Sequence, residues 1–177
     1  QERPRPERPI LRPAYQGSNP ISDLWSLQAL RMVDQYLIRA YRDSNDIEAR
    51  GCMHLAAGIA GVGFGNAGVH LPHGMSYPVS SHVRDFVPDG FHTDHPLVPH
   101  GMSVILNAPA VFRFTASANP ERHRQAANAL GAKVSGISDD NIGEALADRI
   151  IEFMQALQMP NGLEAVGYSE ADIPKLV

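Results

Sequence analysis

Apolar residues recur at spacings of three or four along most of the chain, a pattern that indicates amphipathic helices. The clearest series predicts a helix over about 20–42 and consists of Leu24, Leu27, Leu30, Val33, Leu37 and Tyr41. Similar patterns with capping residues predict further helices at about 46–60, 63–79, 97–116 and 120–131, from Asp139 or Asp140 through Leu157, and from Ser169 to Val177. No polar–apolar alternation of useful length is present, so the predicted fold class is all-α.

Prolines and glycines mark the boundaries that we expect between these elements. The N-terminal prolines are Pro4, Pro6, Pro9, Pro13 and Pro20. Because proline fixes φ and lacks an amide donor, we expect neither a helix nor a central strand before Ser18. The domain prediction is an extended lead-in at 1–19 and one helical domain at 20–177. Closely spaced glycines between 58 and 68 predict two helices that meet near Gly61.

Composition and charge argue against some classes of binding partner, nucleic acid and membrane among them. The apolar fraction of 44% and the charged fraction of 19% are those of an ordinary globular protein. A net charge of -4 argues against nucleic acid as a partner, and no apolar run approaches the length of about 20 residues that spans a membrane. The N-terminal segment lacks the apolar core of a secretory signal. Cys52 is the only cysteine and is expected to be a small buried residue, so a reducing compartment follows, cytoplasmic or alternatively the mitochondrial matrix.

The histidines are the residues with candidate chemistry, since neutral imidazole is a common metal ligand. Six of the eight histidines lie between His70 and His100. His70 and His73 are three residues apart and would share a helix face. Asp94 with two of these histidines could build a two-histidine, one-carboxylate iron site, although each histidine alone is more often structural. The glycines at 61–65 do not predict a phosphate loop, because no strand precedes them, and close helix packing is the preferred interpretation.

Two segments resemble a known family. The sequence AGVGFGNAGVHLPHGM at 60–75, followed by DHPLVPHG at 94–101, resembles the second domain of iron-containing alcohol dehydrogenases, and within them the hydroxyacid-oxoacid transhydrogenase branch. The likeness extends from about 12–20 to 173–174. It implies the helical, C-terminal metal-binding domain of the dehydroquinate synthase-like fold. An α/β nucleotide-binding domain would precede it, so we expect this chain to be a fragment truncated at both ends.

The resemblance also implies roles for particular residues. Family members hold a divalent metal with one aspartate and three histidines, and two of those histidines match His73 and His100. The other two ligands belong to an Asp-x-x-x-His helix expected ahead of this chain. Tyr77 stands where many members have a histidine and is the catalytic candidate, Phe64 is expected near the nicotinamide, and His70 is expected beside the site without binding metal. The metal would be Fe²⁺, with Zn²⁺ as the alternative, and NAD or NADP would be bound mainly by the missing domain.

The function that the resemblance implies is hydride transfer between a small alcohol or hydroxyacid and the nicotinamide. In a transhydrogenase the pair would be 4-hydroxybutyrate and 2-oxoglutarate. The isolated chain is expected to be inactive, and the whole protein to be a homo-oligomer. Two alternatives stay open: a non-catalytic helical module that pairs with another chain, and an independent metal enzyme that uses Asp94.

Overall fold

The computed structural model describes residues 7–11 and 16–177, and every regular element in these ranges is helical. The chain forms two compact units, Gln1–Val69 and His70–Val177. The all-α prediction is therefore confirmed. In the described part of the chain no single helix is long and apolar enough to span a membrane. The helices α2 (Ile47–Ala67) and α3 (Leu71–Ser81) pass the test of length and composition only when they are taken together as a broken pair.

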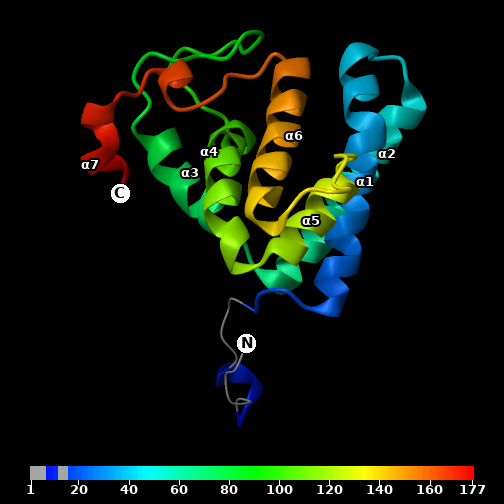
Figure 1. Ribbon diagram of the computed structural model, residues 1–177. Coiled ribbons are helices and arrows are strands. Elements are labelled where there is room, and N and C mark those ends of the chain that lie inside the picture. The colour runs from blue at the N-terminus through cyan, green and yellow to red at the C-terminus, as the bar shows by residue number, and fades with distance from the viewer. Residues whose placement is uncertain (1–6, 12–15) are drawn as a thin grey trace. The chain divides into compact units, whose positions relative to one another are not determined.

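The first unit is a helical hairpin preceded by a short 3-10 helix, η1 (Pro9–Leu11). The expectation of no helix before Ser18 is wrong at this point, because the φ that proline fixes is also that of a 3-10 turn. Helix α1 (Pro20–Arg42) begins where it was expected, because the side chain of Asn19 accepts a hydrogen bond from the amide of Ser22. Helix α2 (Ile47–Ala67) is capped by Asp46, which accepts from the Ala49 amide at 2.9 Å. The two helices pack against each other along their lengths, as Figure 1 shows.

The predicted break near Gly61 is wrong, because α2 is continuous through this residue and ends at Gly68. Gly68 has a φ of 92°, a conformation that side chains with a Cβ rarely adopt, and this explains why the helix ends there. Gly63 serves the close packing that was predicted. A Cβ at this position would lie 2.3 Å from the Ser26 hydroxyl and 3.3 Å from the Ser26 amide nitrogen.

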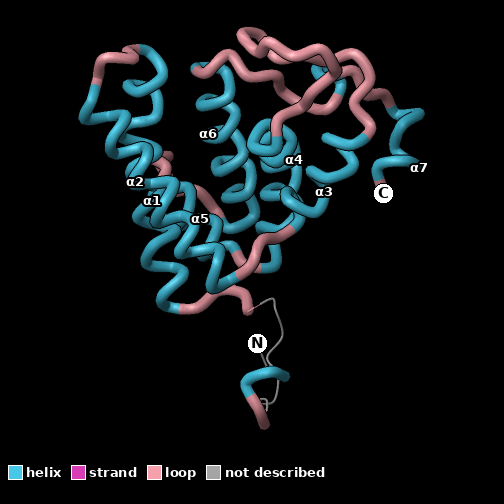
Figure 2. The backbone as a smooth tube through the Cα atoms, turned by 180° about the vertical axis from the view of Figure 1, so that it is seen from behind, coloured by secondary structure: helices cyan, strands magenta, loops and turns pink. Residues whose placement is uncertain are grey.

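The second unit contains α3 (Leu71–Ser81), α4 (His100–Thr115), α5 (Pro120–Ala129), α6 (Ile142–Ala156) and the short α7 (Ile173–Leu176). The 3-10 turns η2 (Ala116–Ala118), η3 (Asp139–Asn141), η4 (Glu164–Val166) and η5 (Glu170–Asp172) join them. Figures 1 and 2 show α3, α4 and α6 side by side, with the long connections 82–99 and 157–169 at the end where α6 finishes. The turn predicted at Pro88–Gly90 is present, with the Phe91 amide bonded to the Pro88 carbonyl at 3.1 Å.

Helix α6 supplies more buried apolar side chains to the core of this unit than any other described helix. The inward positions predicted from its periodicity are buried, namely Ile142, Leu146, Ile150, Phe153 and Met154. Leu157, which was also predicted to face inward, lies just past the end of the helix and is partly exposed. The helix packs against both α4 and α5. Gly143 allows the approach to α4, because a Cβ there would lie 2.6 Å from the Ala116 Cβ and 3.0 Å from the Phe112 carbonyl oxygen.

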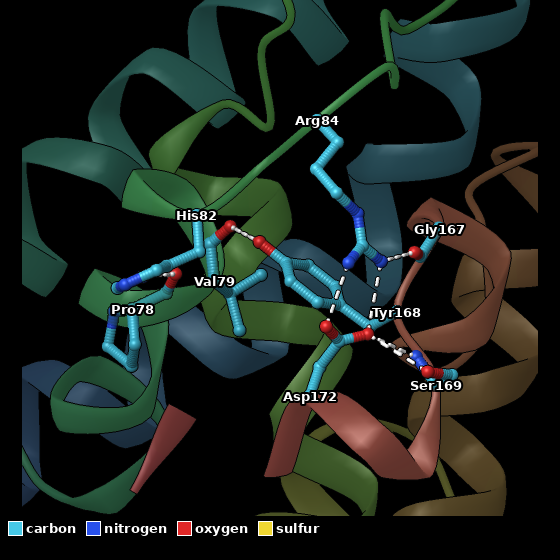
Figure 3. Close-up of polar contacts among 8 residues, drawn as sticks. All are labelled: Pro78, Val79, His82, Arg84, Gly167, Tyr168, Ser169 and Asp172. Atoms are coloured by element: carbon cyan, nitrogen blue, oxygen red, sulfur yellow. Dashed lines mark hydrogen bonds and ion pairs between the residues drawn. The ribbon is translucent and has the colours of Figure 1, made fainter. Parts of the chain in front are cut away.

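The C-terminal segment is fastened to the connection that follows α3 (Figure 3). Arg84 donates two hydrogen bonds to Asp172, from Nη1 to Oδ1 at 2.8 Å and from Nη2 to Oδ2 at 3.0 Å, and a third to the Gly167 carbonyl. Asp172 also accepts from the amide and hydroxyl of Ser169, which is the capping box predicted for this segment. The guanidinium of Arg84, and after it the Ser169 amide, hold the pKa of Asp172 well below its usual range.

We predict that Gly143→Ala destabilises the chain by about 1–3 kcal/mol, because the added methyl meets backbone atoms that cannot rotate away. Gly74→Ala is the matched control, since Gly74 lies in α3 and a Cβ there would have no atom within 4 Å. The control should be neutral or stabilising by up to about 1 kcal/mol. Urea unfolding measures both, and equal midpoints for the two variants would contradict the packing argument.

We also predict that the stability supplied by Asp172 depends on pH. Since its pKa is lowered by folding, this contribution is complete above the unfolded value of about 3.9 and is lost as the pH falls through the folded value. Asp172→Asn should therefore unfold at lower urea than the parent chain at pH 7. The difference between the two should shrink below about pH 4, and a difference that stays constant from pH 7 to pH 3 would count against the ion pair.

Candidate metal centre

Histidines lie at the start of two helices of the second unit. His70 is the N-cap of α3, His73 lies in its first turn and Tyr77 follows one turn later. His100 is the first residue of α4, directly after the N-cap Pro99. Prolines explain why helices begin at these places, because Pro72 and Pro99 lack the amide donor that a first turn leaves unpaired.

The structure brings three of the predicted site residues together. The rings of His73 and His100 lie 5.4 Å apart between centroids, at an interplanar angle of 62°. The Tyr77 ring stacks on His100 at 6.3 Å with an angle of 27°. Tyr77 as a whole is 63% exposed. Residues separated by 27 positions in sequence thus form one cluster on α3 and α4.

Buried serines fix the first turn of each helix. The Ser76 hydroxyl donates to the carbonyl of His73 at 2.6 Å, and the Ser103 hydroxyl donates to the carbonyl of His100 at 2.8 Å. Both serines are fully buried. Sequence reasoning missed them, although a signal was available: His-Gly-Met-Ser occurs at 73–76 and again at 100–103.

The surroundings of His73 favour its neutral imidazole. Partial burial, and after it the neighbouring His100, lower the pKa of His73. Neutral rings have the lone pair that a divalent cation needs. Two imidazoles, however, are half of a usual ligand set of four. Within residues 7–11 and 16–177 no group of three or more histidines, cysteines or carboxylates is placed to hold a metal ion. The residues present therefore fit a divalent metal as a partial site that needs further ligands.

The remaining histidines do not complete the site. The alternative that used Asp94 is wrong, because its side chain is 99% exposed and pairs with the adjacent His95 at 2.9 Å, and the described residues place no metal-binding group around it. His54 is exposed on α2, and His82 is the C-cap of α3, with its Nδ1 3.1 Å from the Pro78 carbonyl oxygen.

His70 and His123 flank a phenylalanine. The rings of His70 and Phe112 are 5.7 Å apart, and those of Phe112 and His123 are 5.9 Å apart. Nε2 of His123 lies 2.9 Å from the Thr115 hydroxyl. Although part of the His70 side chain is accessible to solvent, surrounding protein atoms, and then His73 and His123, lower its pKa. His123 therefore contacts Phe112 and Thr115 within the second unit.

Phe64 and Cys52 belong to the first unit. Phe64 lies in the last turn of α2 and is 52% exposed, and its expected place beside a nicotinamide stays a prediction. The glycines around it are helical residues of α2 and not a loop. Cys52 is partly exposed rather than buried, and its thiol interacts with the hydroxyl of Tyr36 across the hairpin.

Comparisons with known proteins agree on one family. The model of the Fe-containing alcohol dehydrogenase family, C-terminal, matches residues 14–177. Mitochondrial hydroxyacid-oxoacid transhydrogenase from Homo sapiens is 56% identical over 174 residues, which are 98% of this chain and 37% of that protein. A probable mitochondrial hydroxyacid-oxoacid transhydrogenase from Dictyostelium discoideum is 51% identical over 178 residues, covering 100% of this chain and 32% of that protein. The chain thus spans only about a third of the length of these relatives.

Solved structures share the fold. A crystal structure of 1,3-propanediol oxidoreductase superposes with a TM-score of 0.78 at 26% identity, over 91% of this chain and 39% of that one. An alcohol dehydrogenase from Oenococcus oeni gives a TM-score of 0.79 at 23% identity, over 92% of this chain and 39% of that one. The second likeness shows the fold alone.

We predict that the imidazole of His73 titrates below the ordinary value of about 6.5, and that His100→Ala raises its pKa only part of the way back. Burial is the larger cause and would remain in the variant. Two-dimensional NMR of the ring nitrogens between pH 4 and pH 8 measures this, with His95→Ala as a control that should change nothing at His73. An unchanged His73 titration in His100→Ala would show that the rings do not interact.

Proposed function

Since the chain belongs to the iron-containing alcohol dehydrogenase family, we propose that it is the helical metal-binding part of an oxidoreductase. The complete protein would transfer hydride between a hydroxyacid or alcohol and a nicotinamide cofactor. The observation that carries the proposal is the approach of the His73 and His100 rings to 5.4 Å, each at the start of its helix. The family match explains why two imidazoles would be held in this arrangement.

His73 and His100 are the proposed metal ligands. Imidazole suits both Fe²⁺, the metal of the family's name, and Zn²⁺. When bound, such a metal supplies Lewis-acid chemistry that favours the deprotonated alcohol. The serine hydroxyls behind both residues hold the backbone of each first turn, so the two rings keep their relative direction.

Tyr77 is the proposed catalytic residue. Its ring lies over His100 and its side chain is largely exposed. A phenolic O–H group is a hydrogen-bond donor, so Tyr77 would donate a hydrogen bond to the substrate. This differs from a histidine at the same position, which could exchange a proton near pH 7.

The remaining parts of the proposal come from the family and the relatives. NAD or NADP would be bound mainly by a nucleotide-binding domain, with Phe64 contributing from this chain. The hydroxyacid-oxoacid transhydrogenases at 51–56% identity favour a hydroxyacid and an oxoacid as the substrate pair, for which 4-hydroxybutyrate and 2-oxoglutarate are the proposed compounds. Both relatives are named mitochondrial, which favours the mitochondrial matrix over the cytoplasm for the complete protein. The homo-oligomer stays a prediction.

The decisive experiment joins this chain to the segment that precedes the matched region in the Homo sapiens relative. We predict that the chimera oxidises a hydroxyacid in a reaction that stops when the metal is chelated. The chain alone should be inactive. His73→Ala and His100→Ala should each lower the rate of the chimera by at least about 100-fold, since removing groups around a metal already costs about 10–100-fold. His92→Ala, an exposed histidine on the 82–99 connection, is the matched control.

Two results would contradict this proposal. A chimera that folds and binds metal yet has no activity would favour the non-catalytic helical module. Full activity in both histidine variants would remove the assigned ligands while leaving the family membership intact.

A further inference from the structure

Two hydrogen bonds tie the end of α3 to distant parts of the second unit. The Ser80 hydroxyl donates to the carbonyl of Val98 at 3.1 Å, and the Tyr168 hydroxyl donates to the carbonyl of Val79 at 2.6 Å (Figure 3 shows the second bond). Val79, Val98 and Tyr168 are all at least 95% buried. Neither bond is required by the assigned metal ligands or by Tyr77.

The Val79 carbonyl needs such a donor. It lies in the last turn of α3, where helical carbonyls have no amide four residues further on. A buried carbonyl without a partner is costly, and water cannot reach this one easily. Burial also raises the pKa of Tyr168, so the phenol keeps its proton and remains a donor. Tyr168 thus completes α3 from the C-terminal segment, which Arg84 and Asp172 hold in place.

The position of these bonds connects them with the histidine pair. Val79 follows Tyr77 by two residues, and Val98 precedes His100 by two residues. The Ser80 bond therefore sets the distance between α3 and the residues that lead into α4. The Tyr168 bond fixes the last turn of α3 relative to the C-terminal segment. His73 lies on the same short helix and moves with this turn as one rigid element.

We propose that Ser80 and Tyr168 are positioning residues of the His73–His100 pair: they hold the end of α3 against the segment before α4 so that the two rings face each other. The consequence of this positioning for metal binding rests on the proposed function. The rings are placed by backbone contacts outside the ligand set, and a shift of about 1 Å in such contacts is enough to weaken a site. Asp172 and Arg84 do not contact the pair and contribute indirectly, by holding the segment that carries Tyr168.

The test uses the chimera described under the proposed function and Co²⁺ alone, with affinity measured by titration, because the 177-residue chain by itself supplies only part of a ligand set. Tyr168→Phe removes one hydroxyl and Ser80→Ala the other, while Ser80→Thr keeps the donor. We expect Tyr168→Phe and Ser80→Ala to weaken Co²⁺ binding about 10-fold each, within the range seen for groups that orient metal ligands, and Ser80→Thr to restore it. Gly143→Ala is the stability control, because its clash lies at Ala116 and Phe112 and should lower stability without weakening binding.

A second measurement follows the rings themselves. Nuclear Overhauser effects between the ring protons of His73 and His100 should weaken in Tyr168→Phe and Ser80→Ala and persist in Gly143→Ala. The proposal is overturned if these effects are unchanged, or if Co²⁺ affinity falls in Gly143→Ala as far as in the other variants. Retained Co²⁺ binding in His73→Ala and His100→Ala would instead refute the ligand assignment, and the ring-proton measurement would still decide the positioning role.

Discussion

The contact between α3 and α4 is the interaction on which the chemistry of the second unit depends. Each helix brings one histidine ring to the contact, so the pair exists only while the two helices stay together. A displacement of one helix would separate the rings, because the 82–99 connection is too long to fix their distance by itself. The position of α3 must therefore come from packing and from hydrogen bonds made by residues outside the pair.

Small residues make this close packing possible without leaving buried polar atoms unpaired. Ser76 and Ser103 are fully buried at the start of α3 and α4, and each hydroxyl bonds to a carbonyl of its own helix. A buried hydroxyl satisfied within its own turn leaves the helix surface narrow without leaving a polar atom unpaired. Gly63 in the first unit and Gly143 in the second act by the same principle, since a Cβ at either position would overlap a neighbouring helix. Close helix approach is thus a recurring constraint on this sequence.

Much of the fold could be predicted from patterns within a few residues, whereas contacts between residues far apart in the sequence could not. The start of α1 and the capping box at Ser169 follow from residues within one turn, so the sequence revealed them. The end of α2 was misplaced because glycine content cannot distinguish a helical glycine such as Gly61 from one with positive φ such as Gly68. His73 and His100 came from family resemblance, whereas Tyr168 contacts α3 across 89 positions and has no local pattern that would reveal it.

The charge of the histidine pair limits what this chain can bind by itself. A divalent cation leaves water most readily for a site that offers negative charge as well as lone pairs. His73 and His100 offer lone pairs only, and the described residues place no carboxylate with them. A further carboxylate ligand, as the family resemblance implies, would compensate part of the cation's charge. The lowered pKa of His73 works in the same direction, because fewer protons compete for its ring at neutral pH. The chain is therefore suited to hold a cation jointly with an anionic group and poorly suited to hold one alone.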